Sequence, residues 1–158
     1  MLNAGDKAPD FSLSDQDGNM VTLSSFSGSK VIIFFYSKDS TPGCTRQALG
    51  FSKSIEKYNK LGIKVIGISK DSVESHKRFS KRYDLKITLL SDPDREVIKK
   101  YDALTEKKKG DVSVLSTVRS SFFINEEGII TDARYKVKAD TNSGELLEFI
   151  EGKSEREF

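Results

Sequence analysis

Reactive sulfur is scarce in this sequence, because its 158 residues include a single cysteine, Cys44. One cysteine permits no disulfide within the chain, which agrees with a reducing compartment and makes any thiol redox cycle depend on a second molecule. Histidine is equally rare, and the one copy, His76, is followed by Lys77 and Arg78 on a predicted helix. We therefore interpret His76 as a solvated or half-buried residue rather than a catalytic base, and we predict no metal site.

Long hydrophobic runs are also absent, so we predict no membrane span. Residues 1–6 lack the basic and apolar stretches of a secretory signal, and we expect a cytoplasmic protein. The 26 Lys and Arg nearly balance the 24 Asp and Glu, so the net charge gives no indication of a nucleic acid partner. The length predicts a single domain over residues 1–158.

The cysteine follows directly after an apolar stretch. Residues 31–36 predict a buried strand, Thr41 suits the N-cap of a helix and Pro42 suits its first turn. Cys44 then lies in the first turn, where free backbone N–H groups and the helix dipole favour a thiolate, the nucleophilic form of sulfur. Apolar residues recur at helical spacing after Cys44, so we expect its side chain beside the core and only partly exposed.

Periodicity predicts a mixture of strands and helices around this segment. Alternation on both sides of a polar turn predicts an N-terminal hairpin of residues 10–13 and 20–23. A strand, a helix and a second strand then form a βαβ unit, which requires parallel pairing. These elements span residues 30–36, 42–61 and 63–68.

The second half of the chain predicts further alternation of elements. We expect a helix from about Asp71, a strand at 87–90, a helix capped by Asp92-Pro93, a polar loop at 106–111, a hairpin of 118–124 and 129–135, a last helix from about Ser143 and a frayed tail at 151–158.

Arg119 is a candidate counter-charge for the thiolate. It begins a predicted strand, where an exposed arginine is ordinary, although its neighbours Val118 and Phe122 are also compatible with a buried guanidinium. The order of strands in the sheet decides between these two readings, and periodicity does not give that order.

Two segments together resemble a known family. Residues Thr41-Pro42-Gly43-Cys44-Thr45 and the later Val118-Arg119-Ser120-Ser121-Phe122 are similar to peroxiredoxins, in the branch of bacterioferritin comigratory protein, also called peroxiredoxin Q. The similarity runs from Gly5–Phe11 to the last helix and includes residues 89–92 and 106–108. It implies an α/β, thioredoxin-like fold with a mixed central sheet flanked by helices and an N-terminal β-hairpin. It also implies thiol-dependent reduction of hydrogen peroxide and small organic hydroperoxides, without a cofactor.

The resemblance implies a role for each matching residue. Cys44 matches the cysteine that attacks the peroxide, Thr41 the active-site threonine, and Arg119 the arginine that holds thiolate and peroxide. Backbone N–H groups near Gly43 and Cys44 are expected to help align the substrate. The product is a sulfenic acid, the first and reversible step of cysteine oxidation.

Three positions depart from the family pattern. Ser37 stands where relatives usually have a proline over the active site, and Leu49 and Ser80 stand where different relatives have the cysteine that resolves the sulfenic acid. The sequence is compatible both with a natural serine at Ser80 and with an engineered replacement of cysteine. Resolution then requires an outside thiol, with thioredoxin, glutaredoxin or a small thiol as candidates.

Other readings stay open at this point. The missing resolving cysteine and Ser37 are also compatible with a thioredoxin-like binding or holdase protein that has lost catalysis. A thiol-disulfide oxidoreductase is disfavoured because there is no Cys-x-x-Cys pair. The basic run 107–109 lies beside acidic residues with no interleaved aromatics, which indicates a solvated loop rather than a nucleic acid site. We expect a monomer or a weak homodimer.

Overall fold

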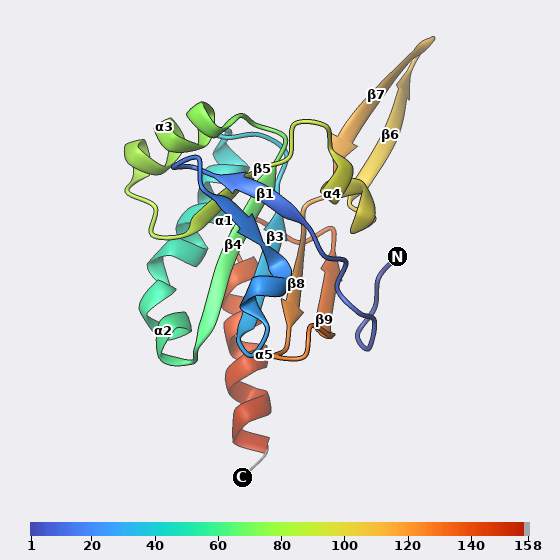
Figure 1. The fold of residues 1–158 in the computed structure, drawn as a ribbon. Coiled ribbons are helices and arrows are strands. Elements are labelled where there is room, and N and C mark those ends of the chain that lie inside the picture. The colour runs from blue at the N-terminus through green and yellow to red at the C-terminus, as the bar shows by residue number, and fades with distance from the viewer. Residues whose placement is uncertain (157–158) are drawn as a thin grey trace.

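A computed structural model describes residues 1–156, in which a mixed sheet of seven strands forms the centre (Figure 1). The strand order across the sheet is β2-β1-β5-β4-β3-β8-β9. The strands are β1 (Ser12–Asp15), β2 (Met20–Thr22), β3 (Lys30–Phe35), β4 (Ile63–Ser69), β5 (Thr88–Ser91), β8 (Ser120–Ile124) and β9 (Ile130–Tyr135). The helices are η1 (Leu23–Phe26), α1 (Pro42–Lys53), α2 (Ile55–Lys60), α3 (Val73–Tyr83), α4 (Glu96–Lys100) and α5 (Asn142–Arg156).

The central strand β3 organises the sheet. It pairs in parallel with β4, which pairs in parallel with β5, and it pairs antiparallel with β8 on its other side. Every residue of β3 after Lys30 is buried, because both faces of this strand are covered. The predicted βαβ unit and the mixed sheet are therefore confirmed, as are the N-terminal hairpin β1–β2 and the hairpin β8–β9.

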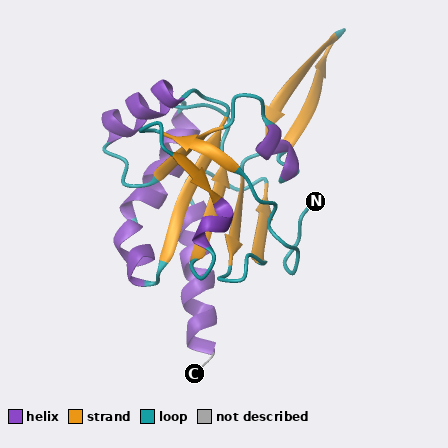
Figure 2. Ribbon diagram, in the orientation of Figure 1, coloured by secondary structure: helices purple, strands orange, loops and turns teal. Residues whose placement is uncertain are grey.

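Two hydrophobic clusters cover the two faces of the sheet. Helices α1, α2, α3 and α5 pack over one face of the sheet (Figure 2). On this face, alternate β3 residues such as Ile32 and Phe34 belong to one buried cluster with Phe51 and Leu146. Segment η1, helix α4 and the N-terminal residues cover the other face, over Ile33 and its neighbours. This alternation follows from the opposite directions of successive side chains in a strand.

Three predicted helix boundaries are wrong. The helix predicted over 42–61 is two helices, α1 and α2, that meet at Ser54. Helix α3 begins at Val73, after the side chain of Ser72 accepts a hydrogen bond from the Ser75 N–H, rather than near Asp71. Helix α4 begins only at Glu96, because residues 93–94 form a turn before it.

The polar loop predicted at 106–111 is also wrong. The strands β6 (Leu104–Lys109) and β7 (Val112–Thr117) pair antiparallel as a hairpin that projects from the sheet in Figure 1. Gly110 makes the tight turn with a left-handed φ of 64°. The charged run in β6 carries no apolar alternation to indicate a strand, whereas Val112 and Val114 of β7 alternate with a serine but are exposed.

Helix α5 reaches into the predicted frayed tail. It continues to Arg156, and residues 157–158 lie outside the described part of the chain. None of the helices within residues 1–156 is long and apolar enough to cross a bilayer.

Gly67 marks a close contact in the sheet, opposite Phe34 in the β3–β4 register. A Cβ added at Gly67 would lie 2.6 Å from Cζ of Phe34, which is fully buried and stacks on Phe51 with ring centroids 4.5 Å apart. Because the packed ring has little room to move, we expect Gly67→Ala to lower the free energy of unfolding by about 2 kcal/mol in denaturant titrations.

Gly144 provides the matched control, because a Cβ there meets no atom within 4 Å. It lies in α5, so Gly144→Ala should leave stability unchanged or raise it by up to about 1 kcal/mol. Equal losses in the two variants would contradict the packing explanation.

Candidate active site

The sole cysteine lies in the first turn of α1, as predicted, but it is buried rather than partly exposed. Its residue exposure is 1%, because α1 packs this face against the sheet. Thr41 occupies the N-cap position with an extended backbone, and its carbonyl accepts from the Thr45 N–H at 2.9 Å. Pro42 begins the helix, so the turn that carries Cys44 follows directly from the loop after β3.

Two polar side chains reach the sulfur of Cys44. The hydroxyl of Ser37 lies 3.4 Å from Sγ, and Nη2 of Arg119 donates to Sγ at 3.5 Å. When the sulfur is a thiolate, it accepts hydrogen bonds from both groups, because a guanidinium is always a donor and a hydroxyl can act as one. The sulfur therefore lies between a neutral donor and a positive charge.

Strand pairing brings the arginine to this position. Phe35, the last residue of β3, pairs with Ser120, the first residue of β8, so Arg119 lies where β3 ends. The guanidinium is half-buried, and its Nη1 donates to Oε1 of Gln47 at 2.8 Å. Of the two readings that the sequence leaves open, the structure places Arg119 against the site rather than on an open surface.

The arginine is itself held by a buried chain of amide and hydroxyl groups. Gln47 on α1 donates to Asn142, the first residue of α5, at 3.0 Å, and Asn142 donates to the hydroxyl of Ser121 at 2.9 Å. All three side chains are buried. Because their polar atoms are paired, this chain fixes the direction of the Arg119 guanidinium at low cost.

Gly43 leaves room for the arginine. A Cβ added at Gly43 would lie 3.0 Å from Nη2 of Arg119, the atom that donates to Cys44. A larger residue would press on the guanidinium and move it from the sulfur.

Thr41 lies at the N-cap, but its side chain makes no capping hydrogen bond among the described residues. Its hydroxyl instead donates to the Lys38 carbonyl at 2.8 Å. This bond holds the loop between β3 and α1 in a tight turn and leaves the lone pairs of the Thr41 oxygen free to accept.

The environment lowers the pKa of the Cys44 thiol below its ordinary value. Burial alone raises this pKa, because it disfavours the charged form. Hydrogen bonds to the thiolate outweigh burial, with the charge of Arg119 as a further contribution. The hydrogen bonds come from the Ser37 hydroxyl and the Lys38 backbone. The Thr41 hydroxyl has one proton, which it donates to the Lys38 carbonyl.

Two residues of the site were missed by sequence reasoning. Ser37 was interpreted only as the loss of a proline, whereas its hydroxyl adds a donor beside the sulfur. Gln47 lies on the same face of α1 as Cys44, one helical turn later, and this spacing was the available signal. His76 was expected to be solvated or half-buried and is fully buried, with both ring nitrogens in hydrogen bonds.

The two candidate resolving positions lie on different helices. Leu49 on α1 is partly buried against the core. Ser80 on α3 is half-buried, and its hydroxyl donates to the Leu85 carbonyl at 3.4 Å.

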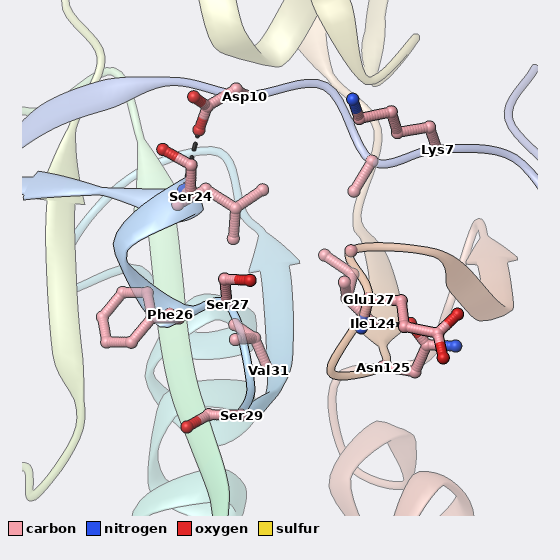
Figure 3. A pocket seen from close by; sticks show the side chains of 13 residues that line it. Lys7, Asp10, Ser24, Phe26, Ser27, Ser29, Val31, Ile124, Asn125 and Glu127 are labelled. Carbon is pink, nitrogen blue, oxygen red and sulfur yellow. Dashed lines mark hydrogen bonds between the residues drawn. The ribbon is translucent and has the colours of Figure 1, made fainter.

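A cavity of about 280 Å³ lies elsewhere, near the start of β3 rather than its end (Figure 3). Residues of η1 face the turn between β8 and β9 across it, with Lys7 and Asp10 from the N-terminal segment. Since Cys44 follows the other end of β3, this cavity is not part of the site around the sulfur.

Comparison with known proteins gives a consistent result. Residues 4–133 match the AhpC/TSA family. A bcp homologue of Coxiella burnetii is 41% identical over 146 residues, which cover 92% of this chain and 97% of the relative. The chloroplastic peroxiredoxin Q of Triticum aestivum is 38% identical over 151 residues, which cover 95% of this chain and 67% of the relative.

Solved structures agree with the sequence relatives. A peroxiredoxin Q variant of Xanthomonas campestris superposes with a TM-score of 0.89 at 34% identity, and the match covers 96% of this chain and 99% of that one. These similarities extend over the sheet, the helices and the segment that carries Cys44. The chain therefore belongs to the AhpC/TSA family of peroxiredoxins, in the branch of peroxiredoxin Q and bacterioferritin comigratory protein, and has their thioredoxin-like fold.

Proposed function

We propose that this peroxiredoxin reduces hydrogen peroxide and small organic hydroperoxides through Cys44, and that an external thiol completes its cycle. The observation that carries the proposal is the buried sulfur held between the Ser37 hydroxyl and the Arg119 guanidinium. A thiol with a lowered pKa is a thiolate over a wider pH range, and the thiolate is the form that attacks peroxide.

The chemistry of the first step assigns a role to each group. The Cys44 thiolate attacks the terminal peroxide oxygen, so a sulfur–oxygen bond forms while the oxygen–oxygen bond breaks. The electron pair leaves on the other oxygen, which takes a proton and departs as water or an alcohol. Arg119 stabilises the thiolate first and then the departing oxygen, because positive charge is useful wherever negative charge develops.

Thr41 and the start of α1 are proposed to orient the peroxide. The Thr41 hydroxyl donates to the Lys38 carbonyl, so its oxygen is left to accept from the peroxide O–H. Free N–H groups around Gly43 and Cys44 at the beginning of the helix can donate to the peroxide oxygens. Gly43 also keeps the space above Cys44 open for Arg119.

The second step requires another molecule, since no second cysteine is present. A thiol attacks the Cys44 sulfenic acid to give a mixed disulfide and water, and a second thiol then releases the reduced enzyme. Thioredoxin, glutaredoxin and small thiols are candidates. The need for a reductant also favours a reducing cytoplasmic setting. We further propose that residues 1–158 act as one domain. The protein is then a monomer or a weak homodimer.

Ser80 is proposed as the position of the resolving cysteine in relatives. Two structures of the Xanthomonas campestris protein carry single cysteine-to-serine replacements. Their two replaced positions are separated by as many residues as separate Cys44 from Ser80 in this chain. A catalytically lapsed binding protein is not favoured, because the thiolate partners are all in place around the sulfur.

The first prediction concerns the reactivity of the thiol. One equivalent of hydrogen peroxide added to the reduced protein should oxidise Cys44 much faster than a free thiol in solution, as followed by mass spectrometry. The oxidation rate should be constant above the lowered pKa of Cys44 and fall about tenfold per pH unit below it, because only the thiolate reacts. A rate no higher than that of a free thiol would refute the peroxidase proposal.

The second prediction concerns the guanidinium. Arg119→Met should lower the rate constant for peroxide oxidation about a hundredfold or more, because it removes a charged donor from the reacting atoms. Arg46→Met is the control, since Arg46 lies on the same helix as Cys44 but forms an exposed ion pair with Asp140. Stopped-flow oxidation rates that fall equally in both variants would contradict a specific role for Arg119.

The third prediction concerns resolution. In Ser80→Cys, peroxide should produce a disulfide between Cys44 and the introduced thiol, seen as loss of two hydrogens by mass spectrometry under non-reducing conditions. Ser113→Cys is the control, because Ser113 lies on the exposed β6–β7 hairpin and should give no such bond. Equal disulfide yields from the two variants, or none from Ser80→Cys, would argue against position 80.

A further inference from the structure

A second polar cluster lies between the loop of residues 36–41, helix α3 and strand β5. It makes no hydrogen bond to the sulfur among the described residues. His76 on α3 is fully buried, and its Nδ1 lies 2.7 Å from Oδ2 of Asp39, which is 7% exposed. The other ring nitrogen, Nε2, lies 2.9 Å from the carbonyl oxygen of Leu90 on β5. The pair therefore connects the loop to two other elements of the fold.

The contacts of His76 hold its ring from two sides. One ring nitrogen faces the carboxyl group of Asp39 and the other faces a backbone carbonyl of β5. The side chain is fully buried, so these two contacts fix the direction of the ring.

The contacts of Asp39 hold its carboxyl group from the loop and from α3. The group accepts from the Tyr36 hydroxyl at 2.6 Å and from the Ser75 hydroxyl at 2.8 Å, in addition to its contact with His76. The carboxyl group therefore has three partners and little freedom to turn. Burial and then the charge of Asp39 raise the pKa of Tyr36 well above its usual value, so this hydroxyl stays a donor.

Asp71 completes the surroundings of the pair. Its Oδ2 accepts from the Asp39 backbone N–H at 2.8 Å and from the Ser69 hydroxyl at 2.7 Å. Ligand atoms of Asp39, Asp71 and His76 lie within 4.8 Å of one another, as a small metal site requires. The hydrogen bonds already use these atoms, so the cluster is satisfied without an ion.

Asp39 is thereby fixed at both its backbone and its side chain, in the middle of the loop that surrounds the sulfur. The same loop contributes the Ser37 hydroxyl and the Lys38 backbone, which lower the pKa of Cys44. It also contains Ser40 with a left-handed φ of 64°, a strained conformation that persists only where neighbouring contacts enforce it.

We propose that the hydrogen-bonded Asp39–His76 pair is a positioning device for the active site: it holds the loop of residues 36–41 so that its donors stay aimed at the Cys44 sulfur. This inference rests on the proposed function of Cys44. Neither residue is hydrogen-bonded to the Cys44 sulfur, whose partners are Ser37 and Arg119, so both act through the loop. Loss of the pair lets the loop relax, so the thiolate loses hydrogen bonds although Cys44, Ser37 and Arg119 are all present.

His76→Gln tests the proposal. We expect the pKa of Cys44 to rise in titrations of thiolate absorbance, which report on one residue because the chain has one cysteine. The rate constant for peroxide oxidation at neutral pH should fall by about tenfold to a hundredfold, as expected for displaced reacting groups. An unchanged thiol pKa together with an unchanged oxidation rate would overturn the proposal.

A matched control separates positioning from stability. Tyr58 lies on α2, in the hydrophobic cluster that also contains Cys44, and Tyr58→Phe removes a buried hydroxyl that donates to the Ser143 carbonyl at 3.0 Å. It should lower Tm without changing the thiol pKa. If His76→Gln and Tyr58→Phe moved the pKa equally, general loosening would explain the effect and the proposal would fail.

The unmodified protein provides a test that does not depend on any variant folding. Because His76 is the single histidine, nitrogen–proton correlation spectra of labelled protein should show a ring N–H that exchanges slowly with solvent, since the side chain is fully buried and hydrogen-bonded. A ring N–H that exchanges as fast as that of free histidine would overturn the hydrogen-bonded pair. Slow peroxide oxidation of the wild-type protein would instead refute the proposed function, so the two failures are distinct.

Discussion

The antiparallel register between β3 and β8 is the constraint on which the active site depends. Phe35 pairs with Ser120, so the chain passes through Arg119 at the point where β3 leaves for α1. Side chains alternate between faces, and a slip of one residue would turn Arg119 away from the sulfur. Buried apolar pairs such as Ile33 with Phe122 hold the register, because a slip would force each side chain into the packed cluster on the opposite face. Core packing thus determines where the positive charge lies.

Burial of the sulfur opposes its ionisation, and hydrogen-bond donors of the protein, rather than solvent, offset this effect. A thiolate in an apolar cluster is costly unless it is hydrogen-bonded, and the Ser37 and Arg119 side chains meet that need. These donors are useful only if they cannot turn away. Gln47 on α1 and Asn142 on α5 hold the guanidinium of Arg119. Asp39 and His76 hold the loop of residues 36–41.

Local signals in the sequence predicted the parts of the site that are local in the chain. The apolar run before residue 36 and the Thr41-Pro42 start of α1 placed Cys44 in a first helical turn, as found. The near-complete burial of Cys44 was not predicted, because it depends on how α1 lies on the sheet. The partner Arg119 depends on strand order, and no periodicity within one segment encodes which strands become neighbours.

The remaining errors have related causes. The β6–β7 hairpin buries little, and the charged run in β6 carries no apolar alternation to indicate a strand. His76 stands in a highly charged helix and was interpreted from its sequence neighbours, although α3 turns that side towards Asp39 and β5. A buried hydrogen-bonded pair between residues distant in the chain follows from tertiary packing, which a single sequence does not specify.

The exposure of the sulfur separates the two halves of the catalytic cycle. At 1% exposure, Cys44 is reached only when the residues around it move, and a thiol reductant needs a larger opening than a small peroxide does. Peroxide attack benefits from a loop held rigidly by Asp39 and His76, because the donors must stay aligned. Resolution by an external thiol requires that the same loop or the first turn of α1 open. The chain has no second cysteine of its own, so an external thiol must reach Cys44. Stronger contacts of Asp39 and His76 with the loop therefore favour attack on peroxide and hinder resolution, and weaker contacts do the reverse.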